Sequence, residues 1–167
     1  MIEIHIPGRE RLIIRNLVLD LNGTITLDGK IIEGVAERLK ALSRQVNIFL
    51  VTADTRGRAG QTLEKLKAEP EDHEKPFSIK LHKVENGEED LQKQQLVHGL
   101  GSPETISIGN GSNDAYMLKE SAVGVCIVGR EGAAVAALMN ANIVTSQIND
   151  ALDLLLVPQR LAATLRK

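Results

Sequence analysis

Short apolar runs alternate with amphipathic segments along most of the chain, and this alternation is the feature that most restricts its fold. Apolar runs bounded by turn residues predict strands over residues 16–20, 46–51, 77–81, 105–109, 123–128 and 142–145. Apolar residues at helical spacing predict helices over residues 33–43, 58–67, 89–100, 114–120, 133–139 and 149–166, the last one interrupted near Pro158. The alternation predicts an α/β fold with a mostly parallel sheet and helices on both of its faces.

The amino-terminal residues carry a different pattern. Residues 2–6 alternate apolar and polar side chains, Pro7-Gly8 is a turn signal, and residues 11–15 return as a second strand. We expect this N-terminal hairpin to add an antiparallel edge or a flap. Residues 68–75 are polar without periodicity, which indicates a solvated loop rather than a linker, so we expect a single domain over residues 1–167.

Composition and charge argue against several classes of function. The formal net charge is -2, so no strong field favours nucleic acid or an acidic membrane. Aromatic residues make up 2% of the chain, which leaves few rings to stack on bases and requires an aliphatic core. The single cysteine, Cys126, excludes an intrachain disulfide, and the histidines lack zinc-ligand spacing. Without a signal-peptide pattern or a long apolar stretch, the expected location is cytoplasmic.

The residues that follow the predicted strands are the candidates for chemistry, because open parallel sheets bind ligands outside the carboxyl ends of their strands. Asp20 ends the first parallel strand, Thr52 ends the second, and Asp114 lies in the loop after a later strand. Lys93 lies early in the helix before that later strand. We therefore expect these four polar groups to meet at one edge of the sheet.

Each of these residue types suits phosphoryl transfer. A carboxylate such as Asp20 can attack phosphorus and form an aspartyl-phosphate. Gly23 permits a sharp turn whose backbone N–H groups can face a phosphate. The hydroxyl of Thr52 and the ammonium of Lys93 can hold the transferring oxygens. Asp20 and Asp114 can share a magnesium ion, which prefers oxygen ligands.

Two of these assignments have rivals. Lys80 and Lys83 lie near the end of a predicted strand and compete with Lys93 for the phosphate. Asp54 and Arg56 follow Thr52 and either reach the substrate or form a loop with a helix cap.

Four segments in order resemble the motifs of the haloacid-dehalogenase (HAD) superfamily. Residues 20–26, Asp-Leu-Asn-Gly-Thr-Ile-Thr, are similar to its first motif, Asp-x-Asp-Gly-Thr. Thr52 is similar to the second motif and Lys93 to the third. Residues 109–115, Gly-Asn-Gly-Ser-Asn-Asp-Ala, resemble the fourth, Gly-Asp-Gly-x-Asn-Asp-Ala. The resemblance covers residues 16–150, most of the chain.

Within the superfamily, the chain resembles the phosphorylation domain of P-type ATPases and the small stand-alone proteins called soluble P-type ATPase-like. The resemblance implies a three-layer, Rossmann-like fold with a small flap. Only about 30 residues separate Asp20 from Thr52, and the segment from Thr52 to Lys93 is short, so we expect no nucleotide-binding insertion and no large cap domain. ATP hydrolysis and ion transport are therefore not implied. Neighbouring subunits often cover the site in capless relatives, so a homo-oligomer is one expectation.

The resemblance also implies a role for each matching residue. Asp20 is the expected nucleophile, and Lys93 is expected to bind phosphate during catalysis. The other expected phosphate-binding positions are Gly23, Thr24, Thr52 and Ala53. The expected magnesium ligands are Asp20, Asn22 through its backbone carbonyl, Asn110 and Asp114. The candidate substrate contacts are Asp54, Arg56 and Asn113.

Two amides replace carboxylates of the family pattern. Asn22 stands at the catalytic position where phosphatases of the family carry a general acid and base, and an amide cannot transfer that proton. General acid–base help accelerates reactions by roughly a hundred- to ten-thousand-fold, so we expect slow turnover. Asn110 replaces a metal-binding Asp and brings no charge, so we expect weaker magnesium binding than in a full site.

Two hypotheses follow. In the first, the chain is a magnesium-dependent phosphohydrolase or phosphotransferase that acts on small phosphorylated substrates with good leaving groups, such as acyl and aryl phosphates. In the second, it is a catalytically impaired module of the same fold that binds phosphate or a metabolite and serves regulation. The retained Asp20, Thr52, Lys93 and Asp114 favour the first hypothesis, and the two amides favour the second.

Overall fold

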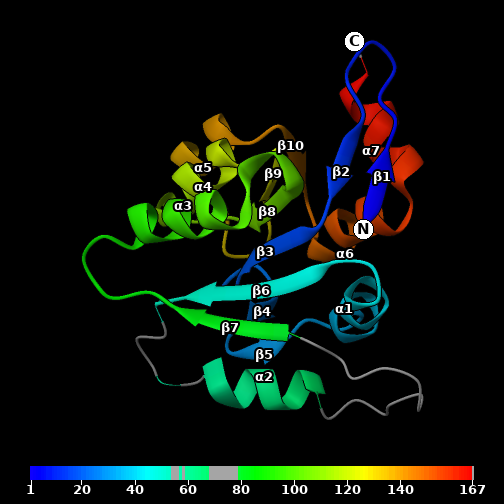
Figure 1. Ribbon diagram of the computed structural model, residues 1–167. Coiled ribbons are helices and arrows are strands. Elements are labelled where there is room, and N and C mark those ends of the chain that lie inside the picture. The colour runs from blue at the N-terminus through cyan, green and yellow to red at the C-terminus, as the bar shows by residue number, and fades with distance from the viewer. Residues whose placement is uncertain (54–56, 58, 68–78, 167) are drawn as a thin grey trace.

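A six-stranded parallel sheet forms the centre of the fold in the computed structural model, which describes residues 1–53, 57, 59–67 and 79–166 (Figure 1). The strands stand in the order β10–β9–β8–β3–β6–β7, and every neighbouring pair is parallel. Their bounds are β3 Asn16–Asp20, β6 Asn47–Thr52, β7 Ile79–Lys83, β8 Thr105–Gly109, β9 Val123–Ile127 and β10 Ile143–Thr145. The α/β class predicted from the alternation is confirmed.

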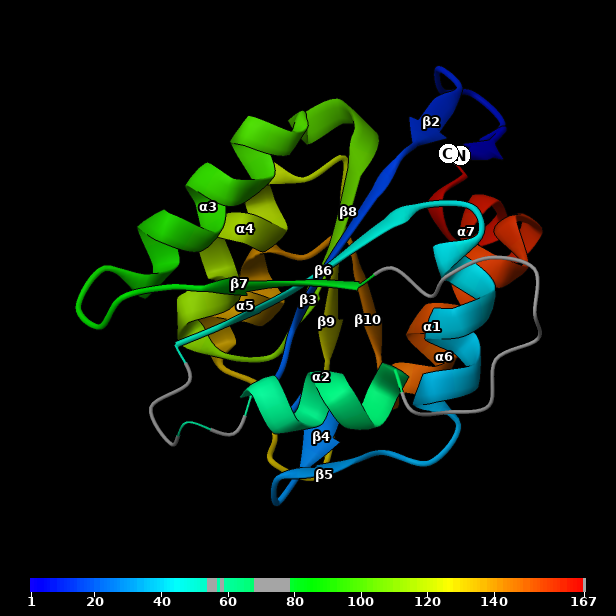
Figure 2. The same cartoon turned by 60° about the horizontal axis from the view of Figure 1, so that its bottom comes forward.

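Helices cover both faces of this sheet. Their bounds are α1 Val35–Ser43, α2 Ala59–Lys67, α3 Glu89–Leu100, α4 Ala115–Glu120, α5 Val135–Asn140, α6 Ile148–Leu156 and α7 Pro158–Leu165. Short 3-10 turns cover Ser102–Glu104 and Ser112–Asp114. Helices α3, α4 and α5 lie on one face, and α1 and α6 lie on the other (Figures 1 and 2). The predicted interruption near Pro158 is confirmed, because Pro158 begins a separate helix at a position where its missing N–H costs nothing.

Strand β3 shows why the fold has three layers. All five of its residues are buried, as expected for a central parallel strand. Leu17 and Leu19 belong to the large aliphatic core shared with α1 and α6. Val18 points to the opposite face and packs in a second core with Val97 and Met117 of α3 and α4. Because both faces are covered, only the strand's carboxyl end is open to a ligand.

Two hairpins stand apart from the central sheet. Strands β1 (Ile2–Ile4) and β2 (Leu12–Ile14) form a two-stranded sheet of their own. This hairpin packs against α7, so it does not extend an edge of the central sheet. The expected flap is the pair β4 (Thr26–Leu27) and β5 (Lys30–Ile31), directly after β3.

Part of the sequence prediction falls outside the described residues. This holds for the polar loop over 68–75 and for the start of the strand predicted over 77–81, which is described as β7 from Ile79. Across the described residues, no helix combines the length and the apolar character that a membrane crossing requires.

Strand β9 approaches α4 so closely that it requires a glycine. A Cβ atom on Gly124 would overlap the backbone carbonyl of Leu118 at the end of α4. We therefore expect Gly124→Ala to lower the free energy of unfolding by about 1–3 kcal/mol, the usual cost of overpacking. Urea denaturation measures this.

Gly99 provides the matched control, because a Cβ atom there meets nothing within 4 Å and the residue lies in α3. Gly99→Ala should raise the free energy of unfolding by up to about 1 kcal/mol, through helix propensity alone. An equally destabilising effect of both substitutions would contradict the close packing at Gly124.

Candidate active site

The carboxyl ends of three adjacent strands bring the candidate residues together. Asp20 ends β3, and it lies beside Val51 of β6 in the parallel register. On the other side, Leu19 of β3 lies beside Ile108 of β8. The chain leaves β3 toward β6 and returns later on the opposite side as β8, so Asp20 lies at a topological switch point. Ligands of open parallel sheets bind at such points.

A buried ammonium group links two carboxylates below this edge. Lys93 Nζ lies 2.7 Å from Asp20 Oδ1 and 2.7 Å from Asp114 Oδ1. The Lys93 residue is 0% exposed, and α3 carries it into the interior. The sequence left Lys80 and Lys83 as rivals. Lys80 instead places its ammonium over the Phe49 ring, 5.4 Å from the centroid, while Lys93 contacts Asp20 directly.

The loop after β8 holds Asp114 in place. Asp114 Oδ2 accepts hydrogen bonds from the backbone N–H groups of Asn110, at 2.9 Å, and Gly111, at 2.8 Å. Its other oxygen, Oδ1, accepts a hydrogen bond from Lys93 Nζ. Asp114 thus orients both the loop and the ammonium group. Direct coordination of a metal by Asp114 stays a prediction.

Burial and the neighbouring charges shift the pKa values of Asp20 and Lys93. Burial raises the pKa of Asp20, the charge of Asp114 raises it further, and Lys93 opposes both, which leaves the pKa at about 7. Burial lowers the pKa of Lys93, but the charges of Asp20 and Asp114 outweigh this and hold it above its ordinary value. When all three groups are ionised, two carboxylates share one ammonium. The remaining negative charge favours an additional cation.

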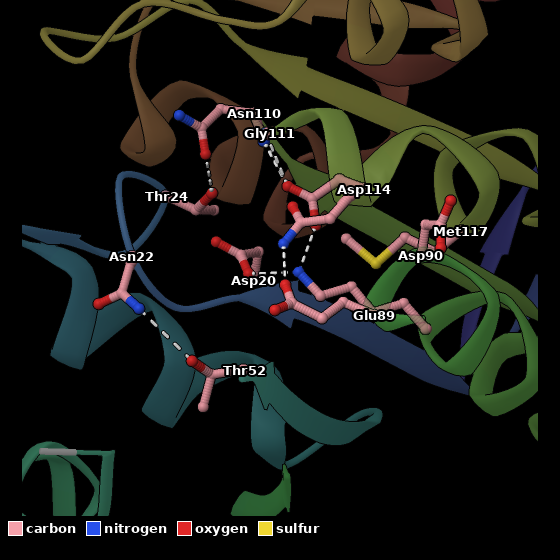
Figure 3. A network of polar contacts seen from close by, with 12 residues as sticks. Asp20, Asn22, Thr24, Thr52, Glu89, Asp90, Asn110, Gly111, Asp114 and Met117 are labelled. Carbon is pink, nitrogen blue, oxygen red and sulfur yellow. Dashed lines mark hydrogen bonds and ion pairs between the residues drawn. The ribbon is translucent and has the colours of Figure 1, made fainter. Parts of the chain in front are cut away.

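Two polar pairs lie near Asp20 (Figure 3). Asn22 Nδ2 donates to Thr52 Oγ1 at 3.4 Å. Thr24 Oγ1 donates to Asn110 Oδ1 at 3.2 Å. Gly23, between them, adopts a φ of 74° in the turn that begins the flap. The first and fourth motifs therefore touch at this edge of the sheet.

A cavity of about 320 Å³ opens above Asp20. Its lining includes most of the predicted site residues: Asp20, Asn22, Thr52, Ala53, Lys93, Asn110 and Asn113. Gly23 and Thr24 line a neighbouring cavity of about 770 Å³ instead, and Asp114 lies buried beneath. Asp54 and Arg56 lie outside the described residues.

Two glutamates that line the cavity, Glu89 and Glu131, were not among the site residues predicted from the sequence. Glu89 accepts a hydrogen bond of 2.6 Å from Asn113 Nδ2. It lies one helical turn before Lys93, so its position on the same face of α3 was a usable signal. Glu131 also lines the cavity, in the loop after β9, although its neighbour Arg130 lines the other cavity. Its signal was its place at the carboxyl edge of the sheet.

The donor atoms of this cavity fit a magnesium ion. Asp20, Asn22 and Asn110 line it, and each of these residues carries oxygen atoms, the ligands that magnesium prefers. The space beside Gly23, which a Cβ atom would fill, is bordered by polar atoms of Asn110 and Glu131. When all three groups are ionised, the two carboxylates of Asp20 and Asp114 share the single ammonium of Lys93, and this excess of negative charge also favours a bound cation.

Sequence comparison finds relatives over part of the chain. The uncharacterized protein MJ0073 of Methanocaldococcus jannaschii is 39% identical over 92 residues, which are 53% of this chain and 99% of that protein. The human phospholipid-transporting ATPase IG is 52% identical over 46 residues, which are 25% of this chain and 4% of the ATPase. No protein-family model matches the chain.

Comparison with solved structures finds phosphatases of the same fold. The cobalt-bound deoxy-D-mannose-octulosonate 8-phosphate phosphatase of Haemophilus influenzae has a TM-score of 0.65 at 14% identity, over 92% of this chain and 94% of that one. The corresponding Moraxella catarrhalis enzyme, with magnesium, phosphate and sugar bound, has a TM-score of 0.63 at 14% identity and the same coverage. A HAD-superfamily structure from Legionella pneumophila reaches 0.65 at 18% identity, over 90% and 86%. At these identities the likeness establishes the fold.

The raised pKa of Asp20 has a consequence for stability. Since the folded-state pKa is about 7 and the ordinary value is 3.8, ionisation of Asp20 opposes folding as the pH rises through this window. Asp20→Asn should therefore raise the melting temperature at pH 8 in metal-free buffer, by about 2–4 °C for each kcal/mol recovered. The gain should shrink as the pH falls toward 4, which thermal denaturation across this pH range measures.

Asp150 is an exposed aspartate in the first turn of α6 and serves as the matched control. Asp150→Asn should bring no gain at any pH. A lower melting temperature of Asp20→Asn at pH 8 would contradict the assigned charge balance.

Lys93 gives the complementary test. Lys93→Met leaves the carboxylates of Asp20 and Asp114 buried without their ammonium partner. We expect the free energy of unfolding at pH 8 to fall by about 3–5 kcal/mol, the usual cost of breaking a buried ion pair. In the Asp20→Asn background, where one charge is absent, the loss should be smaller. Equal losses in both backgrounds, measured by urea denaturation, would show that the two side chains do not interact energetically.

Proposed function

Because the chain belongs to one family with MJ0073 and has the haloacid-dehalogenase fold, we propose that it is a magnesium-dependent phosphohydrolase or phosphotransferase that forms an aspartyl-phosphate at Asp20. The observation that carries this proposal is the position of Asp20. Its carboxylate lies at the switch point of the sheet, with one oxygen fixed by buried Lys93, on the wall of a cavity lined by polar side chains.

The reaction takes two steps at this carboxylate. In the first, the second oxygen of Asp20 attacks phosphorus, a new P–O bond forms, and the leaving group departs with the electron pair of its own P–O bond. In the second, water attacks the same phosphorus and the bond to Asp20 breaks. Phosphate leaves and the carboxylate is restored. With an acceptor hydroxyl in place of water, the second step becomes phosphoryl transfer.

The surrounding side chains hold the phosphoryl group. The Lys93 ammonium, fixed by Asp114, lies within hydrogen-bond distance of Asp20 and offsets negative charge where the phosphoryl oxygens arrive. Thr52, Ala53 and Asn113 line the same cavity and face the substrate. A volume of about 320 Å³ is at the lower end for ligand pockets, which favours a small phosphorylated molecule.

Asp20, the Asn22 backbone carbonyl and the Asn110 amide oxygen would hold a magnesium ion at this cavity. When bound, it neutralises charge between the anionic nucleophile and the anionic substrate. The oxygens of Asp114 accept hydrogen bonds from Lys93 and from the backbone N–H groups of Asn110 and Gly111. Asp114 therefore positions the ammonium of Lys93 and the loop that carries Asn110.

The chemistry of Asn22 sets the substrate preference. Its amide donates to Thr52 and cannot protonate a departing oxygen. Leaving groups that depart without protonation, such as acyl and aryl phosphates, are therefore favoured over alkyl phosphates. The same amide slows hydrolysis of the aspartyl-phosphate, because no carboxylate at this position activates water.

Kinetics with two phosphomonoesters test this proposal. We expect magnesium-dependent hydrolysis of para-nitrophenyl phosphate, little hydrolysis of glycerol phosphate, and loss of activity in Asp20→Asn. Asn22→Asp restores an acid, so its rate gain should reach roughly a hundredfold for glycerol phosphate and be smaller for the aryl ester, which needs less protonation.

Asn86, in the exposed turn before α3, provides the control for an added carboxylate. Asn86→Asp should leave both rates unchanged. Activity that survives Asp20→Asn would refute the assigned nucleophile, and rapid hydrolysis of glycerol phosphate by the wild type would refute the role given to Asn22.

A further inference from the structure

The loop after β9 places the carboxylate of Glu131 at the cavity, and Glu131 is not among the site residues expected from the sequence. Residues Gly129 and Gly132 close a tight turn, in which the Gly132 N–H donates to the Gly129 carbonyl at 2.9 Å. Glu131 lies within this turn and lines the same cavity as Asp20. Its position depends on the turn and not on any strand or helix.

Two hydrogen bonds tie this turn to Asn110. Asn110 Nδ2 donates to the Gly132 carbonyl at 3.2 Å, and the Ala134 N–H donates to the Asn110 carbonyl at 2.8 Å. The loop that carries Glu131 and the loop that carries Asn110 therefore hold a fixed relation to each other. A side chain on one of these loops is therefore held at a constant position relative to a ligand bound at the other loop.

Gly23 marks the place where the two side chains converge. A Cβ atom on Gly23 would lie 2.5 Å from Glu131 Oε2, 2.8 Å from Asn110 Nδ2 and 3.2 Å from Asn110 Oδ1. The Glu131 carboxylate and the amide that replaces a metal-binding Asp thus border the same space beside the backbone of the first motif. Any residue larger than glycine at this position would push the carboxylate away.

In the part of the chain that the structure describes, no residue donates a hydrogen bond to the Glu131 carboxylate or forms an ion pair with it. Glu89, the other glutamate of the cavity, differs because Asn113 Nδ2 holds its carboxylate at 2.6 Å. A carboxylate that lies near the Asn110 amide group and lacks a cation partner among the described residues suits a hard cation.

We propose that Glu131 supplies the carboxylate that the Asn110 position lacks, and that it joins Asp20 and Asn110 around the magnesium ion. This inference rests on the proposed function of the site. It modifies the expectation of weak magnesium binding, because the charge missing from the fourth motif returns from the loop after β9. Glu131 then acts on the metal, whereas Asp20 alone forms the bond to phosphorus.

Magnesium binding measured by isothermal titration calorimetry tests the proposal without relying on activity. Glu131→Gln keeps the size of the side chain and removes its charge, and its exposed turn should tolerate the change. We expect the dissociation constant for magnesium to rise about tenfold, as the loss of one nearby carboxylate ligand implies. Glu89→Gln, the same change in the same cavity, should raise it by clearly less. Circular dichroism verifies that both variants fold.

A second substitution tests whether the two positions serve one ion. Asn110→Asp should tighten magnesium binding more in the Glu131→Gln background than in the wild type, because the two carboxylates then substitute for each other. Equal gains in both backgrounds would overturn the proposal. So would a Glu131→Gln effect below about threefold, an equal effect of Glu89→Gln, or the absence of saturable magnesium binding in the wild type.

The outcome is separable from the test of function. Hydrolysis that depends on Asp20, together with unchanged magnesium affinity in Glu131→Gln, would overturn only the role of Glu131. Magnesium binding that depends on Glu131 in a protein without hydrolytic activity would support the role of Glu131 and refute the proposed reaction.

Discussion

The buried ammonium of Lys93 is the interaction on which the rest of the site depends. It joins Asp20 at the end of β3 to Asp114 in the loop after β8, and α3 delivers it between them. Burying such charges costs several kcal/mol per ion unless each one is paired and hydrogen-bonded. The pairing therefore fixes three segments that are distant in sequence into one arrangement. Burial, together with the charge of Asp114, raises the pKa of Asp20. When all three groups are ionised, one carboxylate charge is left unbalanced, which favours a cation.

The sheet and the centre of the site could be predicted because local pattern determines them. The apolar run of β3 identifies a doubly buried strand, and an acid at its end is placed at the ligand-binding edge whatever the loops do. The approach of Glu131 to Gly23 has no such periodic signal, since it arises from a glycine turn tied to Asn110. The packing of the β1–β2 hairpin on α7 was also beyond prediction, because its isoleucines could have covered any apolar surface.

The amides of Asn22 and Asn110, which replace two carboxylates of the family pattern, have different consequences for the proposed site. In the proposed reaction, Asn22 supplies no proton donor, whereas Asn110 supplies no charge to the proposed magnesium ion, and these are separate losses. Glu131 is placed to offset the second loss but not the first, because it lies on the Asn110 side of Gly23. In the proposed function, the site keeps its nucleophile, its phosphate-binding groups and its cation, and it releases the phosphoryl group slowly.

The most direct test of this account is capture of the phosphorylated protein. Wild type incubated with magnesium and acetyl phosphate, quenched in acid and digested, should yield a phosphorylated peptide that contains Asp20 and loses its phosphate in hydroxylamine. Asp20→Asn should yield none, and Asn22→Asp should lose the phosphate faster than the wild type. Absence of this peptide from the wild type, or a phosphate on another residue, would contradict the central claim that Asp20 is a nucleophile toward phosphorus.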